Sequence, residues 1–118
     1  MGAGDRQFRR VIVGPEFALS FVLGDQSFSR IALANLSEGG CLALVPGDRA
    51  GAFVGDDLLE ELTILHELLP SHPVEARVAY AFGAGDLELV GIGIQFLSMS
   101  PGLRQSLRDF VDSVPIAP

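Results

Sequence analysis

The amino-acid sequence predicts a small all-β fold, an antiparallel barrel capped by one C-terminal helix. Between residues 11 and 97, short apolar runs alternate with turns rich in Gly, Asp and Ser, as expected for many short strands. The C-terminal segment instead has apolar residues at helical spacing. The 118 residues are 48% hydrophobic and 19% charged, which is enough to build one core. Because no repeat, low-complexity tract or long linker divides the chain, we expect residues 1–118 to form a single domain.

The apolar runs are predicted to be strands. Residues Gly24 to Ser27 are interpreted as a hairpin loop between the second and third runs. Side chains of a strand alternate between its two faces, so the third run has a predicted inner and outer set. One set is Phe28, Arg30, Ala32 and Ala34, and the other is Ile31, Leu33 and Asn35; in a later run Val74, Ala76, Val78 and Tyr80 share a face. The predicted strands are Val11 to Val13, Phe17 to Leu23, Phe28 to Leu36, Cys41 to Val45, Val74 to Phe82 and Leu87 to Leu97.

Two further segments contain leucines at helical spacing. The segment Leu58 to Leu69 fits a helix by that spacing, but its alternation around Ile64 also fits a strand, so both assignments stay open. Residues 100–113 are predicted to be a helix, because Ser100 is a good N-cap and Pro101 suits the first helical position. The stripe that this helix buries is Leu103, Leu107, Phe110 and Val111.

Composition and charge exclude several classes of function. The net charge of −7 repels nucleic acid and anionic lipid, and no apolar run reaches the roughly 18 residues of a membrane helix. We therefore expect no DNA or RNA partner, no membrane insertion and a cytoplasmic location. The single cysteine, Cys41, excludes an internal disulfide and a cysteine-based metal cluster, and we expect it to be a small buried hydrophobe.

No pair of residues suggests catalysis. His66 and His72 lack carboxylate or cysteine neighbours at ligand spacing, so we interpret them as structural or exposed. The acidic group Asp56, Asp57, Glu60 and Glu61 is interpreted as a solvated face in preference to a cation site. We therefore predict no catalytic residue, no metal site and no enzymatic activity.

Two short stretches carry more polar groups than a fold requires. All eight basic residues are arginines, and Arg6, Arg9 and Arg10 lie within five positions of one another, which is typical of an anion site or of a solvated tail. The stretch ANLSEGGC, residues 34–41, reverses the chain between two apolar runs. A two-residue turn would suffice for a hairpin, so the extra polar groups indicate either a ligand or an Asx-turn.

These stretches together resemble the PilZ domain family. Arg6 and Arg10 form an R-x-x-x-R spacing ahead of the run VIV, and Asn35, Ser37 and Gly40 match a [D/N]-x-S-x-x-G pattern. The closing GIGIQFLSMSPGLRQSLRDFV is similar to the last strand and helix of that family. The similarity covers nearly the whole chain and is weakest from about Pro46 to Leu69.

The resemblance implies a six-stranded PilZ-type barrel that binds the second messenger cyclic di-GMP and relays its level to a protein partner. It implies no cofactor besides this ligand. Arginine and asparagine side chains suit phosphate and guanine edges, while a glycine lets the backbone approach the ligand closely. We expect residues 1–10 to be a flexible arm that becomes ordered over the ligand. The predicted ligand-binding residues are Arg6, Arg9, Arg10, Asn35, Ser37, Gly39 and Gly40.

Two other functions remain open at this point. A PilZ-like module that binds a protein and no nucleotide would keep the fold without the affinity. A small barrel that holds an apolar ligand would need an open hydrophobic cavity and would be indifferent to Arg6 and Arg10. The downstream pathway, the number of ligand molecules and the oligomeric state are also open.

Overall fold

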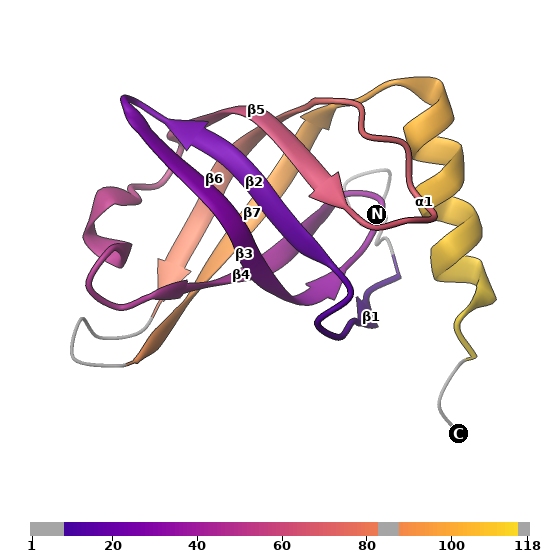
Figure 1. The fold of residues 1–118 in the computed structure, drawn as a ribbon, viewed down its shortest axis with the longest axis horizontal. Coiled ribbons are helices and arrows are strands. Elements are labelled where there is room, and N and C mark those ends of the chain that lie inside the picture. The colour runs from indigo at the N-terminus through magenta and orange to yellow at the C-terminus, as the bar shows by residue number, and fades with distance from the viewer. Residues whose placement is uncertain (1–8, 83–87, 116–118) are drawn as a thin grey trace, which may run out of the picture.

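The computed structural model describes residues 9–82 and 88–115. Seven antiparallel strands lie in the order β1-β3-β2-β5-β6-β7-β4, and pairing between β3 and β4 closes six of them into a barrel (Figure 1). This confirms the predicted fold, with β1 as an extra strand on β3. The elements are β1 (Val11–Ile12), β2 (Ala18–Leu23), β3 (Gln26–Leu36), β4 (Gly40–Pro46), the 3-10 helix η2 (Ala50–Ala52), β5 (Leu58–Leu65), β6 (Val74–Phe82), β7 (Leu89–Ser98) and α1 (Pro101–Ser113).

The predicted faces of β3 are wrong because the strand contains two bulges, one near Arg30 and one at Ala34. The first of these moves Phe28 to the other face. Between the β2–β3 pairs Leu19↔Ile31 and Phe21↔Phe28, β3 has one residue more than β2, and Arg30 adopts a φ of 55° there. Such an extra residue reverses the alternation. As a result Phe28 is buried on the same side as Ile31, and not on the opposite one.

Bulges also explain the ambiguous segment and one misplaced tyrosine. Leu58–Leu65 is strand β5, in which the bulge at Glu61, with a φ of 53°, separates the buried residues Leu59 and Leu62 by three positions. That spacing imitates a helix. In β6, an extra residue between Val78 and Tyr80 turns the tyrosine outward, so it does not share the face of Val74, as alternation predicted.

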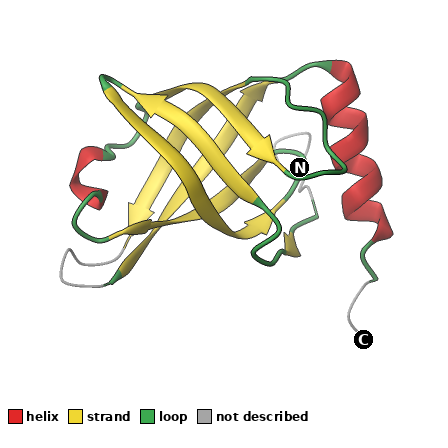
Figure 2. Cartoon of the chain, viewed as in Figure 1, coloured by secondary structure: helices red, strands yellow, loops and turns green. Residues whose placement is uncertain are grey.

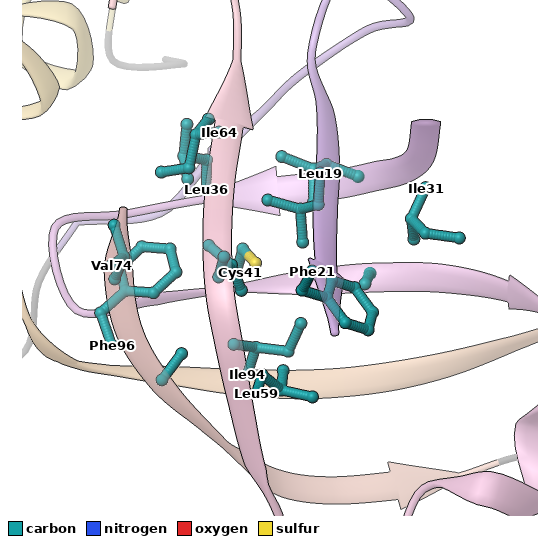
Figure 3. Packing of buried hydrophobic residues seen from close by; sticks show 14 of the residues in the cluster. Leu19, Phe21, Ile31, Leu36, Cys41, Leu59, Ile64, Val74, Ile94 and Phe96 are labelled. Atoms are coloured by element: carbon teal, nitrogen blue, oxygen red, sulfur yellow. The ribbon is translucent and has the colours of Figure 1, made fainter. Parts of the chain in front are cut away.

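Buried side chains fill the barrel, and α1 covers one end. Figure 3 shows apolar side chains from several strands meeting in the interior. Phe28 lies in an aromatic cluster with Phe21 and Phe53, and its ring centroid is 5.1 Å from the centroid of each. In Figure 2, α1 and the short helix η2 lie at opposite ends of the barrel.

Helix α1 begins as the sequence predicted. The Ser100 side chain accepts a hydrogen bond from the Leu103 amide at 3.2 Å, and Leu103, Leu107 and Val111 are buried. Phe110 is partly buried against Phe17, which explains its place in the predicted stripe. No helix in the described ranges, 9–82 and 88–115, is long and apolar enough to cross a membrane.

Candidate ligand-binding site

Strand β1 brings an arginine of the first motif to the asparagine of the second. β1 pairs with the end of β3 through Val11↔Leu36 and Ile12↔Asn35, so Arg10 emerges beside the end of β3. The Arg10 guanidinium donates from Nη1 to Asn35 Oδ1 at 2.8 Å. Arg10 is exposed and Asn35 is half-buried. The pairing of two strands therefore joins the two motifs at a position open to solvent.

A second bulge in β3 aims Asn35 outward. Between the β3–β4 pairs Leu33↔Ala43 and Asn35↔Leu42, β3 has the extra residue Ala34. Bulges of this kind redirect side chains and are frequent next to functional sites. The shift leaves Asn35 accessible while Leu36, the next residue, is fully buried.

Ser37 lies inside the turn that follows and is only 2% exposed. Its Oγ accepts hydrogen bonds from the Gly39 amide at 3.1 Å and from the Gly40 amide at 3.2 Å. The same hydroxyl donates to the Gly40 carbonyl at 3.2 Å. A serine hydroxyl has one donor and two acceptor sites, so these contacts use all of them. Ser37 therefore fixes the shape of the turn.

The two glycines of the turn pack against β7. The Phe96 amide donates to the Gly39 carbonyl at 2.9 Å. A Cβ atom on Gly40 would lie 2.2 Å from the Ile94 carbonyl oxygen, closer than any side chain tolerates. The absence of a side chain at Gly40 thus has a structural reason, the close approach of β4 to β7. That the backbone of Gly40 also lies near a ligand stays a prediction.

Glu38 links this turn to α1, a contact that sequence reasoning missed. Arg108 donates to Glu38 Oε1 from Nε at 3.2 Å and from Nη2 at 3.0 Å, and this hydrogen bond raises the pKa of Arg108. The Glu38 side chain is 15% exposed. Because the two residues lie far apart in the sequence, no local pattern pointed to their contact.

Arg9 is directed toward a different element from its neighbour Arg10. Its Nη1 donates to the Val111 carbonyl at 2.6 Å, and Nη2 donates to the Val114 carbonyl. These are carbonyls at the end of α1, where a cation also interacts favourably with the helix dipole. Of the predicted residues, Arg10 and Asn35 are therefore brought together, Arg9 is bound to the helix end, and Arg6 lies outside the described residues, as does most of the predicted arm.

Cys41 lies directly after the turn and is a small buried hydrophobe, as predicted. Burial raises the pKa of its thiol to about 12, and the positive charge of Arg10 partly opposes that shift. His66 stacks on Phe17 at 4.0 Å between ring centroids, which fits a structural role. Within the part of the chain that the structure describes, no group of His, Cys, Asp and Glu residues could hold a metal ion.

Comparison with known proteins identifies the family to which this arrangement belongs. The PilZ domain model matches residues 5–113. The chain is a member of the PilZ domain family. A comparison with curated proteins gives no match.

Several solved structures have the same fold. The PilZ domain of YcgR from Escherichia coli, in a structure with c-di-GMP, has a TM-score of 0.69 at 15% identity, with 92% of this chain and 90% of that chain covered. The Bacillus subtilis inhibitor of motility MotI/DgrA has a TM-score of 0.73 at 19% identity, with 91% of this chain covered. The MrkH–c-di-GMP complex of K. pneumonia has a TM-score of 0.70 at 13% identity, with 90% covered. This PilZ domain spans about half of the last two chains, 49% and 50% respectively.

Proposed function

We propose that this PilZ domain is a non-enzymatic receptor that binds cyclic di-GMP at Arg10 and Asn35 and relays the binding to a partner protein. The observation that carries the proposal is the hydrogen bond between these two side chains, which joins both family motifs at an accessible position. Family membership and the c-di-GMP named with the YcgR and MrkH structures support the choice of ligand.

The chemistry of the pair suits a cyclic dinucleotide. An arginine has five N–H donors in a planar fork, so Arg10 can keep Asn35 in place and still bind a phosphate or the O6/N7 edge of guanine. The Asn35 amide offers both donors and acceptors. Both residues are polar and accessible, Asn35 lies within β3, and Arg10 directly precedes the paired strand β1. Little backbone entropy is therefore lost when a ligand binds.

The other predicted residues have different parts in this proposal. Ser37, Gly39 and Gly40 shape the turn and hold it against β7, which fixes where Asn35 points. Arg6 completes the R-x-x-x-R spacing and is proposed as a second ligand contact from the sequence motif alone. Arg9 contacts the ligand only if it leaves the carbonyls of α1.

Titration calorimetry with cyclic di-GMP tests the proposal. We expect Arg10→Ala to lose about tenfold to a hundredfold in affinity, because a charge-assisted bidentate contact is worth about 1–3 kcal/mol. Arg10→Lys should bind with intermediate affinity, since it keeps the charge and loses the fork. The matched control is Arg77→Ala, which removes an arginine of β6 that binds Asp56 in the turn before β5.

Two results would contradict the proposal. Equal affinity of wild type and Arg10→Ala would reject the site. No binding by folded wild-type protein would reject the ligand, and would favour the alternative of a PilZ interaction module that does not bind nucleotide.

A further inference from the structure

An apolar groove with an acidic rim lies on the outer wall of the barrel, along β5 and β6. Its volume is about 570 Å³. Two of its leucines are unusually exposed for their size, Leu58 at 63% and Leu97 at 47%. We call it the acidic groove, and it is lined by Leu58, Leu59, Glu60, Glu61, Pro73, Val74, Glu75, Ala76 and Leu97.

The acidic groove lies across the barrel from the candidate ligand site. In the closed order β3-β2-β5-β6-β7-β4, the β5–β6 boundary is three strands from the β3–β4 boundary in either direction. The strands β5, β6 and β7 are neighbours in Figure 1. A molecule bound in the groove would therefore leave Arg10 and Asn35 accessible.

The bulge in β5 places the negatively charged residues of this groove next to one another. Between the pairs Leu59↔Ala76 and Leu62↔Val74, β5 has two residues, Glu60 and Glu61, and β6 has one, Glu75. Three glutamates are thus neighbours across one strand boundary, and all three residues are exposed. Like charges placed opposite one another across strands destabilise a sheet.

No cation of the described residues neutralises these carboxylates. Arg77, the nearest arginine along β6, forms its ion pair with Asp56. Within residues 9–82 and 88–115, none of Glu60, Glu61 and Glu75 forms an ion pair. The groove therefore combines exposed leucines with uncompensated negative charge. A local arrangement that lowers stability without compensation within the fold is the kind expected at a functional surface.

We propose that the acidic groove docks a basic amphipathic segment of a partner protein. Apolar side chains of that segment would cover Leu58 and Leu97, while its Lys or Arg side chains would pair with the glutamates. The inference rests on the proposed receptor role in one respect, because it identifies the kind of partner to which such a receptor would bind. Docking in the groove does not itself require cyclic di-GMP.

The negative charge of the groove favours a basic protein segment over the other molecules that could bind there. A symmetric contact between two copies of this chain would place the same three glutamates of each copy against the other, in a protein of net charge −7. Nucleic acid and anionic lipid are repelled for the same reason. A basic segment gains attraction from every carboxylate that it meets, and complementary charge also speeds its association.

Selection from a random peptide display library tests this directly. We expect selected peptides to combine Lys or Arg with apolar residues and to bind more weakly as salt rises. Against the triple variant Glu60→Gln, Glu61→Gln, Glu75→Gln, their affinity should fall at least about tenfold. Leu97→Gln should give a comparable loss by removing apolar contact. The matched control is a second triple variant, Asp48→Asn, Glu88→Gln, Asp112→Asn. It also removes three negative charges, but from exposed residues outside the groove, and should leave the affinity unchanged.

Several outcomes would overturn the inference. One is that the selected peptides are neutral or acidic. Another is that the peptides bind the triple glutamate variant as tightly as they bind wild type. A third is that no peptide binds at micromolar concentration. Sedimentation that shows a dimer broken by Leu97→Gln would assign the groove to a second copy. Cyclic di-GMP affinity, measured on the same triple variant, should equal that of wild type, so failure of the docking and failure of the nucleotide site are separate results.

Discussion

The two ends of the motif N-x-S-x-x-G differ in what surrounds them. Asn35 is accessible and bonded to the exposed Arg10. Ser37 and Gly40, a few residues later, are buried and bonded to one another, and Gly39 between them accepts a hydrogen bond from Phe96 of β7. One short pattern thus contains a half that can meet a ligand and a half that holds the barrel together. Substitutions in the two halves should therefore affect different measurements.

The buried half should be most sensitive at Gly40. Because a Cβ would lie 2.2 Å from the Ile94 carbonyl, Gly40→Ala forces the backbones of β4 and β7 apart. We expect a loss of about 3 kcal/mol in the free energy of unfolding, at the upper end of the usual cost of overpacking. Urea denaturation measures it.

Gly51 provides the control for this substitution. A Cβ there has open space, and Gly51 is exposed with no φ in the left-handed region, so Gly51→Ala should change stability by less than about 0.5 kcal/mol. Equal stability of Gly40→Ala and wild type would mean that β4 can move away from β7 at no cost.

Ser37→Ala should have the next largest effect. It removes the acceptor of the Gly39 and Gly40 amides, and unsatisfied buried amides cost about 1–3 kcal/mol. Ser29→Ala, at an exposed position of β3, is the matched control. If Ser37→Ala instead lowered cyclic di-GMP affinity while leaving stability unchanged, the serine would be a ligand contact and the division of the motif would be wrong.

Sequence periodicity predicted α1 and every strand except β5, whose segment it left open between helix and strand, and it did not predict the bulges. The alternation in β3 and β5 fails at Arg30, Ala34 and Glu61, where one extra residue reverses the faces, and nothing in the local pattern marks an insertion. These insertions depend on how each neighbouring strand curves around the barrel.

The candidate site was predicted from motifs, and its internal division was not. The resemblance to PilZ domains selected Arg10 and Asn35, which the structure brings together. The structural reason for Gly40 lies in the Ile94 carbonyl on β7, and the partner of Glu38 lies on α1. Contacts between distant elements of this kind leave no signal in the short stretch itself.

Cys41, directly after the buried half of the motif, makes the stability of the fold depend on pH. Cys41 has a folded-state pKa of about 12, above the usual value of about 8.5 for a cysteine in an unfolded chain. The folded state therefore holds the proton more tightly, so this contribution to stability is complete below about pH 8.5 and is lost as the pH rises toward 12.

Unfolding measured between about pH 8.5 and 10.5 should show this loss, at up to about 1.4 kcal/mol per pH unit. Cys41→Ala is less stable at neutral pH because it leaves a small cavity, but it lacks this titration. The difference between the two proteins should therefore shrink as the pH rises. A constant difference would show that the thiol ionises equally in both states.

The smallest expected effect on folding belongs to the exposed pair. A double-mutant cycle with Arg10→Ala and Asn35→Ala should give a coupling in the free energy of unfolding of no more than about 0.5 kcal/mol, since solvent competes for a hydrogen bond at an accessible position. The same cycle read by cyclic di-GMP affinity should give a larger coupling, because in the proposed complex the ligand contacts both side chains at once. A coupling that is large for unfolding and absent for binding would make the pair a structural clamp like Ser37, and the two halves of the motif would then no longer differ.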